Sequence, residues 1–310
     1  MNCAVIDVGS NTIRLCIYQW KDAKLKKIFS KKETVGLAGY IHQRLMSEEG
    51  IRRCLSVLQE FAETTELFCA QPPRIFATAS LRQADNADEV IRRVRVQTGL
   101  EIDLLSGKEE ALLDFAGATR AVQMGEGVLT DIGGGSIEIV RFRQGEIMLA
   151  ESLDVGSLSL YNRYVSGIFP DKEERRRIRE AVEKRLETLS GAEGEKVKEM
   201  CGVGGTIRNA CKLYNQIYGL PKENRCVPAD GIREILKIYK NPGKTDLQML
   251  LKVAPDRVHT LIPGMLALKE ILRWYDVQTI RISDYGLREG YLMEKVLPSA
   301  PQGDEDESGE

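Results

Sequence analysis

Histidine is scarce in this chain of 310 residues, where only His42 and His259 occur. A histidine-based nucleophilic relay or histidine metal cluster is therefore poorly supported. Carboxylates are the expected general bases, and oxygen atoms are the expected metal ligands, which suits Mg²⁺. The seven cysteines are an odd number without a Cys-x-x-Cys pair, which argues against a disulfide framework and a zinc site. We expect reduced thiols in a cytoplasmic protein, with Cys3, Cys16 and Cys201 serving as packing residues.

Long hydrophobic runs are also missing. No apolar run reaches the roughly 18 residues that a membrane span needs. The first residues lack the basic and then apolar pattern of a secretory signal, so no membrane association is expected. Aromatic side chains do not interleave with the basic run near residues 171–185, so we expect no nucleic-acid partner.

The formal net charge of −2 depends on the last ten residues, which carry five acids and no base. Without them the net charge is +3, which is compatible with a polyanionic substrate but does not require one. Residues 299–310 are expected to form a disordered acidic tail. The charged run from Asp171 to Arg185 is typical of a solvated helix with i,i+4 ion pairs, and a basic surface for a long anion is the alternative.

Strand and helix patterns alternate along the chain, which predicts an α/β fold of two domains. Strands are expected at 3–19, 24–30, 74–79 and 101–105, and helices at 47–67, 86–98 and 108–122. A domain boundary is expected near 123–127. After it, strands at 127–153 repeat the pattern of the N-terminal strands. Helices are then expected within 157–190, 206–218, 229–275 and 286–297, with strands at 198–203 and 277–283.

The most informative feature is a short loop that occurs twice, as VIDVGSNTIRLCIY at 5–18 and LTDIGGGSIEIVRF at 129–142. Asp7 corresponds to Asp131, and Arg14 corresponds to Glu138. Glycine lets backbone N–H groups approach an anion closely. Two such loops, each with a carboxylate, predict a site that holds phosphate and a metal ion from both sides.

The second copy and one further glycine turn fit this pattern. Asp131 and Glu138 flank the 133–136 turn, so both carboxylates are expected to point to one side, although a plain hairpin is possible. A third turn, Gly204-Gly205-Thr206, precedes a helix that Thr206 could cap, with its N–H groups facing an anion.

A helix start at Ser106-Gly107-Lys108-Glu109-Glu110 supplies the candidate general base. Acidic residues in a first helical turn also complement the helix dipole, so this pattern alone does not decide between the two roles. Arg82 follows a predicted strand and could clamp a phosphate, but a surface arginine is common.

These motifs together resemble the exopolyphosphatase / guanosine pentaphosphate phosphohydrolase (Ppx/GppA) family in its short two-domain form. The matching segments occur in the family's order: DVGSNTIRL (7–15), ATASLRQADN (77–86), EIDLLSGKEEA (101–111), LTDIGGGSIEIV (129–140), GVGGTIRNA (202–210) and RISDYGLREG (281–290). The resemblance implies duplicated ribonuclease-H-like domains of the actin, sugar-kinase and Hsp70 superfamily, at 1–124 and 125–298, with an interdomain cleft. The helix at 286–297 could pack back on the first domain.

The resemblance also implies roles for individual residues. Glu110 would be the general base, and Asp131 and Glu138 would be Mg²⁺ ligands or electrostatic anchors. The implied phosphate cradle, with Arg82 as a clamp, consists of Ser10, Asn11, Gly133, Gly134, Gly135 and Ser136.

The expected activity is Mg²⁺-dependent release of orthophosphate from the end of inorganic polyphosphate. The alternatives are hydrolysis of guanosine pentaphosphate or a nucleoside triphosphate, and a sensor that binds polyphosphate or a nucleotide without turnover. Two departures from the family pattern bear on this choice. Gly36 stands where many family members carry a basic residue. We also expect this short form to lack the C-terminal metal-phosphohydrolase-like domain of long members, which would put processivity on very long polymers in doubt. A homodimer is expected through the resemblance alone.

Overall fold

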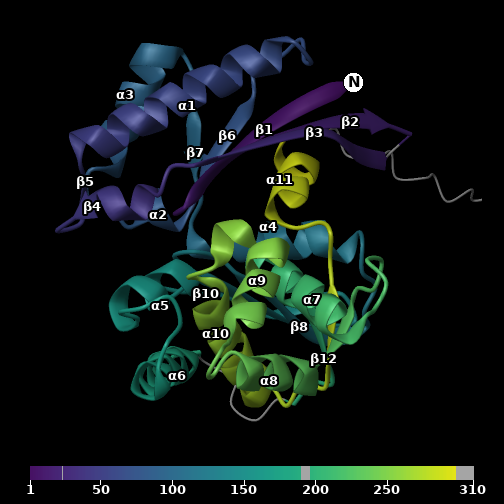
Figure 1. Cartoon of the computed structure of the whole chain (residues 1–310). Coiled ribbons are helices and arrows are strands. Elements are labelled where there is room, and N and C mark those ends of the chain that lie inside the picture. Colours follow the sequence, from purple (N-terminus) through teal and green to yellow (C-terminus); the bar gives the residue numbers. More distant parts are fainter. Residues whose placement is uncertain (23, 190–195, 298–310) are drawn as a thin grey trace, which may run out of the picture.

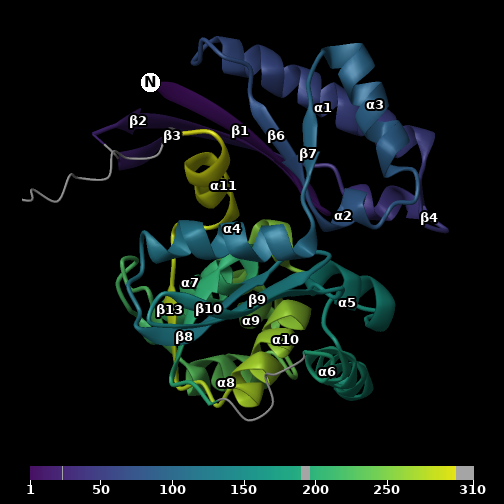
Figure 2. The same ribbon diagram turned by 180° about the vertical axis from the view of Figure 1, so that it is seen from behind.

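The computed structural model describes residues 1–22, 24–189 and 196–297 and shows two α/β halves, each built on its own sheet (Figure 1). The acidic tail predicted for 299–310 lies outside these residues. Figure 2 shows the same two halves from behind, with helices α4 and α11 between the two sheets.

The first sheet has the strand order β3-β2-β1-β6-β7. Strands β1, β2 and β3 are antiparallel neighbours, whereas β6 runs parallel to β1 and β7 parallel to β6. The bounds of the strands are Asn2–Val8 (β1), Thr12–Lys21 (β2), Lys24–Thr34 (β3), Arg74–Ala77 (β6) and Ile102–Leu104 (β7).

The second sheet repeats this plan with the order β10-β9-β8-β11-β13-β12. Its first five strands have the same relative order and directions as the first sheet, and β12 adds an antiparallel edge. The repeated loop therefore marks a duplicated ribonuclease-H-like unit. The bounds of the strands are Glu126–Ile132 (β8), Ile137–Arg143 (β9), Glu146–Leu153 (β10), Glu199–Val203 (β11), Cys226–Pro228 (β12) and Thr279–Ile282 (β13).

Helices cover the faces of both sheets. Helix α1 begins after Ser47, whose side chain accepts a hydrogen bond from Gly50 N–H, and it buries Ile51, Leu55 and Leu58 against the first sheet. The helices that precede β8 in the sequence are Glu48–Glu66 (α1), Ala79–Arg82 (α2), Ala87–Thr98 (α3) and Gly107–Thr119 (α4).

The second half has more helices, and they enclose the larger core. That core includes residues from α6, α7, α8 and α10. The bounds are Ser157–Tyr164 (α5), Lys172–Leu186 (α6), Gly204–Tyr218 (α7), Ala229–Ile238 (α8), Lys244–Val253 (α9), Leu261–Trp274 (α10) and Leu287–Lys295 (α11).

Helices α4 and α11 each pack against the sheet of the other half of the sequence. Ala111 and Phe115 of α4 belong to a core cluster with β8 and β9, whereas Tyr291 and Leu292 of α11 join one with β1 and β2. The two helices cross closely, because a Cβ on Gly290 would lie 1.8 Å from the Leu113 carbonyl oxygen. This crossing ties the two halves together.

The predicted helices and longer strands are confirmed to within a few residues. Four short elements were not predicted: the hairpin of β4 (Ile41–His42) and β5 (Leu45–Met46), the helix α2 and the edge strand β12. The charged run at 171–185 forms α6, a largely solvated helix whose Arg176 pairs with Glu180 at i,i+4. Cys3, Cys16 and Cys201 are buried, as predicted.

Candidate active site

The two repeated loops form the same turn in both sheets. In the first, Gly9 N–H donates to the Thr12 carbonyl at 3.0 Å, and in the second, Gly133 N–H donates to the Ser136 carbonyl at 3.0 Å. Each turn joins the central strand of its sheet to the next antiparallel strand. The similarity in sequence is therefore a similarity in backbone hydrogen bonding.

These turns meet at the junction of the two halves. A Cβ on Gly135 would lie 2.6 Å from Ser10 Oγ and 3.1 Å from the Cβ of Ala79. The Gly134 position is also in contact, since its Cβ would lie 3.4 Å from that of Ser10. Glycine at 135 therefore lets the two turns lie close together, because a side chain there would crowd Ser10 and Ala79.

Beside each turn, the strand register places two charged residues directly opposite each other. Asp7 lies opposite Arg14 in the first sheet, and Asp131 lies opposite Glu138 in the second. Directly opposed residues share one face of a sheet, so the prediction that Asp131 and Glu138 point to one side is confirmed. The corresponding pair in the first sheet has one positive and one negative member.

Of the two carboxylates of the second sheet, Glu138 is buried and Asp131 is half-buried. Glu138 is 1% exposed and accepts a hydrogen bond from Ser152 Oγ at 2.8 Å. Burial raises the pKa of Glu138 well above its usual value, and Glu110 and Asp131 nearby raise it further. Burial also raises the pKa of Asp131, although nearby arginines, Arg208 foremost, oppose this.

Glu110 lies at the start of α4, between the two sheets. It is 6% exposed, and its Oε2 accepts a hydrogen bond from Arg82 Nη1 at 2.9 Å. The same Arg82 nitrogen donates to the Leu105 carbonyl at 2.9 Å, which fixes the guanidinium. Burial raises the pKa of Glu110 to about 7, against the lowering effect of Arg82. A carboxyl group with this pKa can accept a proton near neutral pH.

The neighbouring Glu109 has a different role. Its side chain accepts a hydrogen bond from Ser106 N–H at 2.9 Å, while Ser106 Oγ accepts one from Glu109 N–H, which completes a capping box. Glu109 is exposed and Glu110 is buried. The sequence left the two acids ambiguous, and the structure assigns helix capping to Glu109 alone.

Asp114 is a buried acid that the sequence analysis missed. It is 0% exposed, and neither carboxylate oxygen has a side-chain hydrogen-bond donor in the described part of the chain. Burial raises its pKa well above the usual value, and Asp131, Glu138 and Glu110 raise it further. A signal existed, because Asp114 follows Glu110 by four residues and therefore lies on the same face of α4.

The third glycine turn leads directly into α7. Gly204 has a φ of +77°, and a Cβ there would lie 1.7 Å from Asp131 Oδ1. The Asp131 carboxylate therefore lies against the start of this helix. No side chain caps the helix, so the free N–H groups of Gly204, Gly205 and Thr206 are available to an anion.

The predicted helix cap at Thr206 is wrong. The N-cap is Val203, and Thr206 is fully buried inside the first turn of α7. Its hydroxyl donates to the Ile132 carbonyl at 2.8 Å, so this hydroxyl fastens the turn to β8. Only the Thr206 backbone N–H is left for a phosphate.

A group of arginines beside these turns was also missed by the sequence analysis. Arg288 Nη1 donates to Asp7 Oδ2 at 2.9 Å, and the Arg257 guanidinium covers Gly205, where a Cβ would lie 2.2 Å from Nη2. Burial lowers the pKa of Arg257, and the nearby charges of Arg208 and Arg14 lower it further. Arg208 and Arg288 lie within two motifs that the sequence analysis quoted, but Arg257 follows the separate helix α9 and carried no signal.

The remaining predicted phosphate contacts come from the first turn. The Asn11 carbonyl accepts a hydrogen bond from Gly36 N–H at 2.9 Å, and the Ser10 carbonyl accepts one from Ala38 N–H at 2.9 Å. Gly36 has a φ of +68°, which explains glycine at this departure from the family pattern. Segment 36–38 thus supports the turn through its backbone.

Among the described residues, no group of three or more His, Cys, Asp or Glu side chains is arranged to hold a metal ion as it stands. The chemistry of the site still suits one. Asp114 and Glu138 are buried carboxyl groups whose pKa values are raised by burial and then further by the nearby Asp131, and neither oxygen of Asp114 has a side-chain donor in the described part of the chain. A hard divalent cation would relieve this repulsion with oxygen ligands.

Comparisons with known proteins agree with this geometry. The Ppx/GppA phosphatase family matches residues 16–299. The chain belongs to this family. Exopolyphosphatase 1 of Mycobacterium tuberculosis (strain ATCC 25618 / H37Rv) is 26% identical over 304 residues, which cover 96% of this chain and 88% of that protein. The corresponding protein of Mycobacterium leprae is 25% identical and covers 96% and 90%.

Solved structures of family members have the same fold. The PPX-GPPA enzyme of Aquifex aeolicus superposes with a TM-score of 0.76 at 27% identity, over 94% of this chain and 98% of that chain. An exopolyphosphatase from Cytophaga hutchinsonii gives a TM-score of 0.84 at 22% identity, over 94% and 96%, respectively. The duplicated α/β architecture predicted from the repeated loop is therefore confirmed.

The described helices include none that is both long and apolar enough to cross a membrane. All seven cysteines are free thiols.

Proposed function

We propose that this member of the Ppx/GppA family is an exopolyphosphatase that releases orthophosphate from the end of inorganic polyphosphate. The observation that carries the proposal is Glu110, a buried carboxylate of raised pKa held by Arg82 where the two anion-binding turns meet. The naming of the mycobacterial relatives as exopolyphosphatases supports the choice of substrate.

In this mechanism, the terminal phosphate lies between the glycine turns. Backbone N–H groups at the start of α7, together with Ser10, Asn11 and the 133–136 turn, contact its oxygens. The arginines of the site, Arg82, Arg257 and Arg288 among them, balance the negative charge of the chain. Because the transferred phosphoryl group spreads charge over its oxygens, such positioning supplies most of the catalysis.

Glu110 then activates water. Its ionised carboxylate accepts a proton as the water oxygen forms a bond to the terminal phosphorus. The bond from that phosphorus to the bridging oxygen breaks, and the shortened polyphosphate leaves with the electron pair. A positioned base contributes roughly 10²–10⁴-fold to such a step.

We further propose that Mg²⁺ is the cofactor, held by Asp131 and Glu138 with Asp114 beside them. When bound, the ion would neutralise part of the charge on the phosphoryl oxygens. The buried carboxylates that repel one another support this assignment. Loss of activity with a chelator, and its return with added Mg²⁺, would test it.

The substrate is tested by measuring phosphate release from long-chain polyphosphate, guanosine pentaphosphate and ATP in parallel. We expect the highest kcat/KM with polyphosphate. A preference for either nucleotide would replace the proposed substrate, and no release from any of the three with Mg²⁺ present would leave only the binding role of a sensor.

Two further proposals concern the setting of the protein. A cytoplasmic location is supported by the seven free thiols, since oxidising compartments favour disulfides. A homodimer is supported by the family resemblance, and light scattering after gel filtration would test it.

A further inference from the structure

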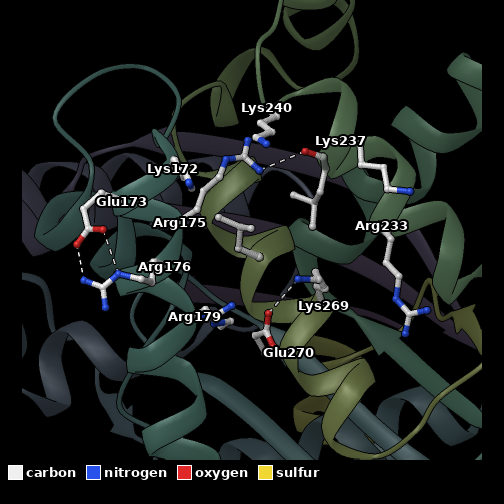
Figure 3. A pocket seen from close by; sticks show the side chains of 12 residues that line it. Lys172, Glu173, Arg175, Arg176, Arg179, Arg233, Lys237, Lys240, Lys269 and Glu270 are labelled. Carbon is white, nitrogen blue, oxygen red and sulfur yellow. Dashed lines mark hydrogen bonds and ion pairs between the residues drawn. The ribbon is translucent and has the colours of Figure 1, made fainter.

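A second basic surface lies far from the two turns, on the side of the second half that faces away from the first sheet (Figures 1 and 2). It is a groove of about 680 Å³ between α6, α8 and α10 (Figure 3). Eight of its twelve lining side chains are basic, two are acidic and two are leucines. The lining residues are Lys172, Glu173, Arg175, Arg176, Arg179, Arg233, Leu236, Lys237, Lys240, Leu266, Lys269 and Glu270.

Part of this charge belongs to ordinary ion pairs. Arg176 pairs with Glu173 and Glu180 on the same helix, and Lys269 lies 3.3 Å from the buried Glu270. Arg179 and Arg233 likewise have acidic partners on or near their own helices. These four cations are thus paired with acidic side chains, an arrangement that is usual on solvated helices and needs no ligand to explain it.

The other four cations have no carboxylate partner among the described residues. Lys172, Lys237 and Lys240 are exposed, and their side chains make no ion pair or hydrogen bond within that part of the chain. Arg175 donates only to backbone carbonyls, those of Pro170, Leu236 and Tyr239. The groove therefore keeps a net positive charge that the fold itself does not neutralise.

Helix stability does not explain all of these positions. Lys237 and Lys240 lie at the C-terminal end of α8, where a cation complements the helix dipole. Lys172 is the first residue of α6, where a cation opposes the dipole. Figure 3 shows Lys172 and Arg175, both of α6, close to Lys240, which follows the end of α8, at one end of the groove. Repulsion between them would favour separation unless an anion binds there.

We propose that this groove binds a segment of a polyphosphate chain, apart from the segment that is cleaved. The proposal rests on the proposed function. Lysine ammonium groups suit a flexible chain of phosphates, because they act as point charges without a demand for planar geometry. No aromatic residue lines the groove, so nucleic-acid bases have no stacking surface. The apolar residues of the lining, Leu236 and Leu266, are both buried, so they offer little surface to a protein partner.

Binding at this groove would make the KM of the enzyme depend on the length of the polyphosphate chain. A long polyphosphate held there stays near the enzyme after each terminal phosphate leaves, which raises the effective concentration of its end. A short chain such as tripolyphosphate cannot occupy the groove and the active site together. The groove therefore lowers KM for long chains and leaves short chains unaffected.

Equilibrium binding separates this proposal from the catalytic one. Long-chain polyphosphate is titrated onto a Glu110→Gln protein, which blocks turnover, with and without the triple change K172Q/K237Q/K240Q. We expect the triple variant to bind on the order of tenfold more weakly, since it removes three exposed charge contacts. The matched control is K21Q/K26Q/K27Q on β2 and β3, which removes the same charge from exposed lysines at the edge of the first sheet.

Kinetics with an intact Glu110 give the second measurement. The groove triple variant should raise KM for long-chain polyphosphate about tenfold, with kcat and all tripolyphosphate parameters unchanged. Unchanged tripolyphosphate turnover also shows that the variant is folded.

Several results would overturn the proposal. Equal weakening by the groove and control variants would mean that only overall charge matters, and equal loss with tripolyphosphate would place the effect in the active site. Single-stranded RNA that binds the groove as tightly as polyphosphate would make nucleic acid the occupant. If the wild-type protein released no phosphate from polyphosphate, the proposed function would fail, while the binding measurement would still decide the groove.

Discussion

Arg82 Nη1 lies 2.9 Å from Glu110 Oε2, and this contact joins the end of α2 to the first turn of α4. The arginine stabilises the ionised form of the acid, while burial favours the neutral form. The balance leaves Glu110 with a pKa of about 7, so this contact positions the proposed base and partly offsets the effect of burial on its protonation.

Replacing Glu110 should remove the base without disturbing the helix. We expect Glu110→Gln to lower kcat by roughly 10²–10⁴-fold, because glutamine keeps the shape but cannot accept the proton. Phosphate release under saturating polyphosphate measures this.

The control for that change is Glu109→Gln, one residue away. Glutamine can keep the capping box, so kcat should be unchanged and stability should fall by no more than about 1 kcal/mol. A similar loss of rate in both variants would contradict the assignment of Glu110.

The pH dependence of the rate should report the same group. Because the ionised form is the active one, kcat should rise with pH through a midpoint of about 7. A pH–rate profile with polyphosphate tests this, and a midpoint near the value of an ordinary exposed glutamate would show that another group limits the reaction.

Stability should change with pH in the opposite direction. A carboxyl group whose pKa is raised by folding stabilises the protein fully below its unfolded pKa, near 4.5, and loses that contribution as pH rises through about 7. Glu110→Gln avoids this loss, so its unfolding free energy relative to wild type should increase on the order of 3 kcal/mol between those values. Urea unfolding at several pH values measures the difference, and a difference that does not vary with pH would contradict it.

Arg82 can be tested through its effect on the base. Arg82→Met should shift the midpoint of the pH–rate profile to more alkaline pH, because the largest influence opposing burial is removed. A change in rate without a shift of the midpoint would mean that Arg82 acts on the substrate alone.

Gly204 offers a test of the third turn. Gly204→Ala should destabilise the protein by about 3 kcal/mol or more, since the new Cβ would meet the Asp131 carboxylate and the backbone has a positive φ. Gly219→Ala is the matched control, because its φ is +64° and nothing lies within 4 Å of the added Cβ. We expect that control to lose only about 1 kcal/mol in thermal unfolding, and equal losses would show that backbone strain alone matters.

Much of the site was predictable because it depends on local sequence. The turns at Gly9 and Gly133 need glycine for their backbone geometry, and the opposition of Asp131 and Glu138 follows from the two-residue period of strands. The prediction that was wrong, a helix cap at Thr206, also came from local sequence. Thr206 resembled a helix cap, but a tertiary bond to the Ile132 carbonyl uses its hydroxyl.

Other features could not be read from any single segment. Arg257 joins the site only because distant elements pack together, and the burial of Asp114 is a property of the whole core, although its spacing from Glu110 on α4 was visible in the sequence. The basic groove likewise combines three helices, although only α6 stood out as a charged run.

The sequence by itself determined that this chain is a duplicated α/β protein with two glycine turns for anions, because repeats and backbone requirements are written in consecutive residues. The family resemblance also named Glu110, whereas the helix-start pattern taken alone gave no physical reason to separate that acid from Glu109. Only the tertiary structure decided between them, because burial and the approach of Arg82 place one acid in a site of raised pKa and leave the other as an exposed helix cap.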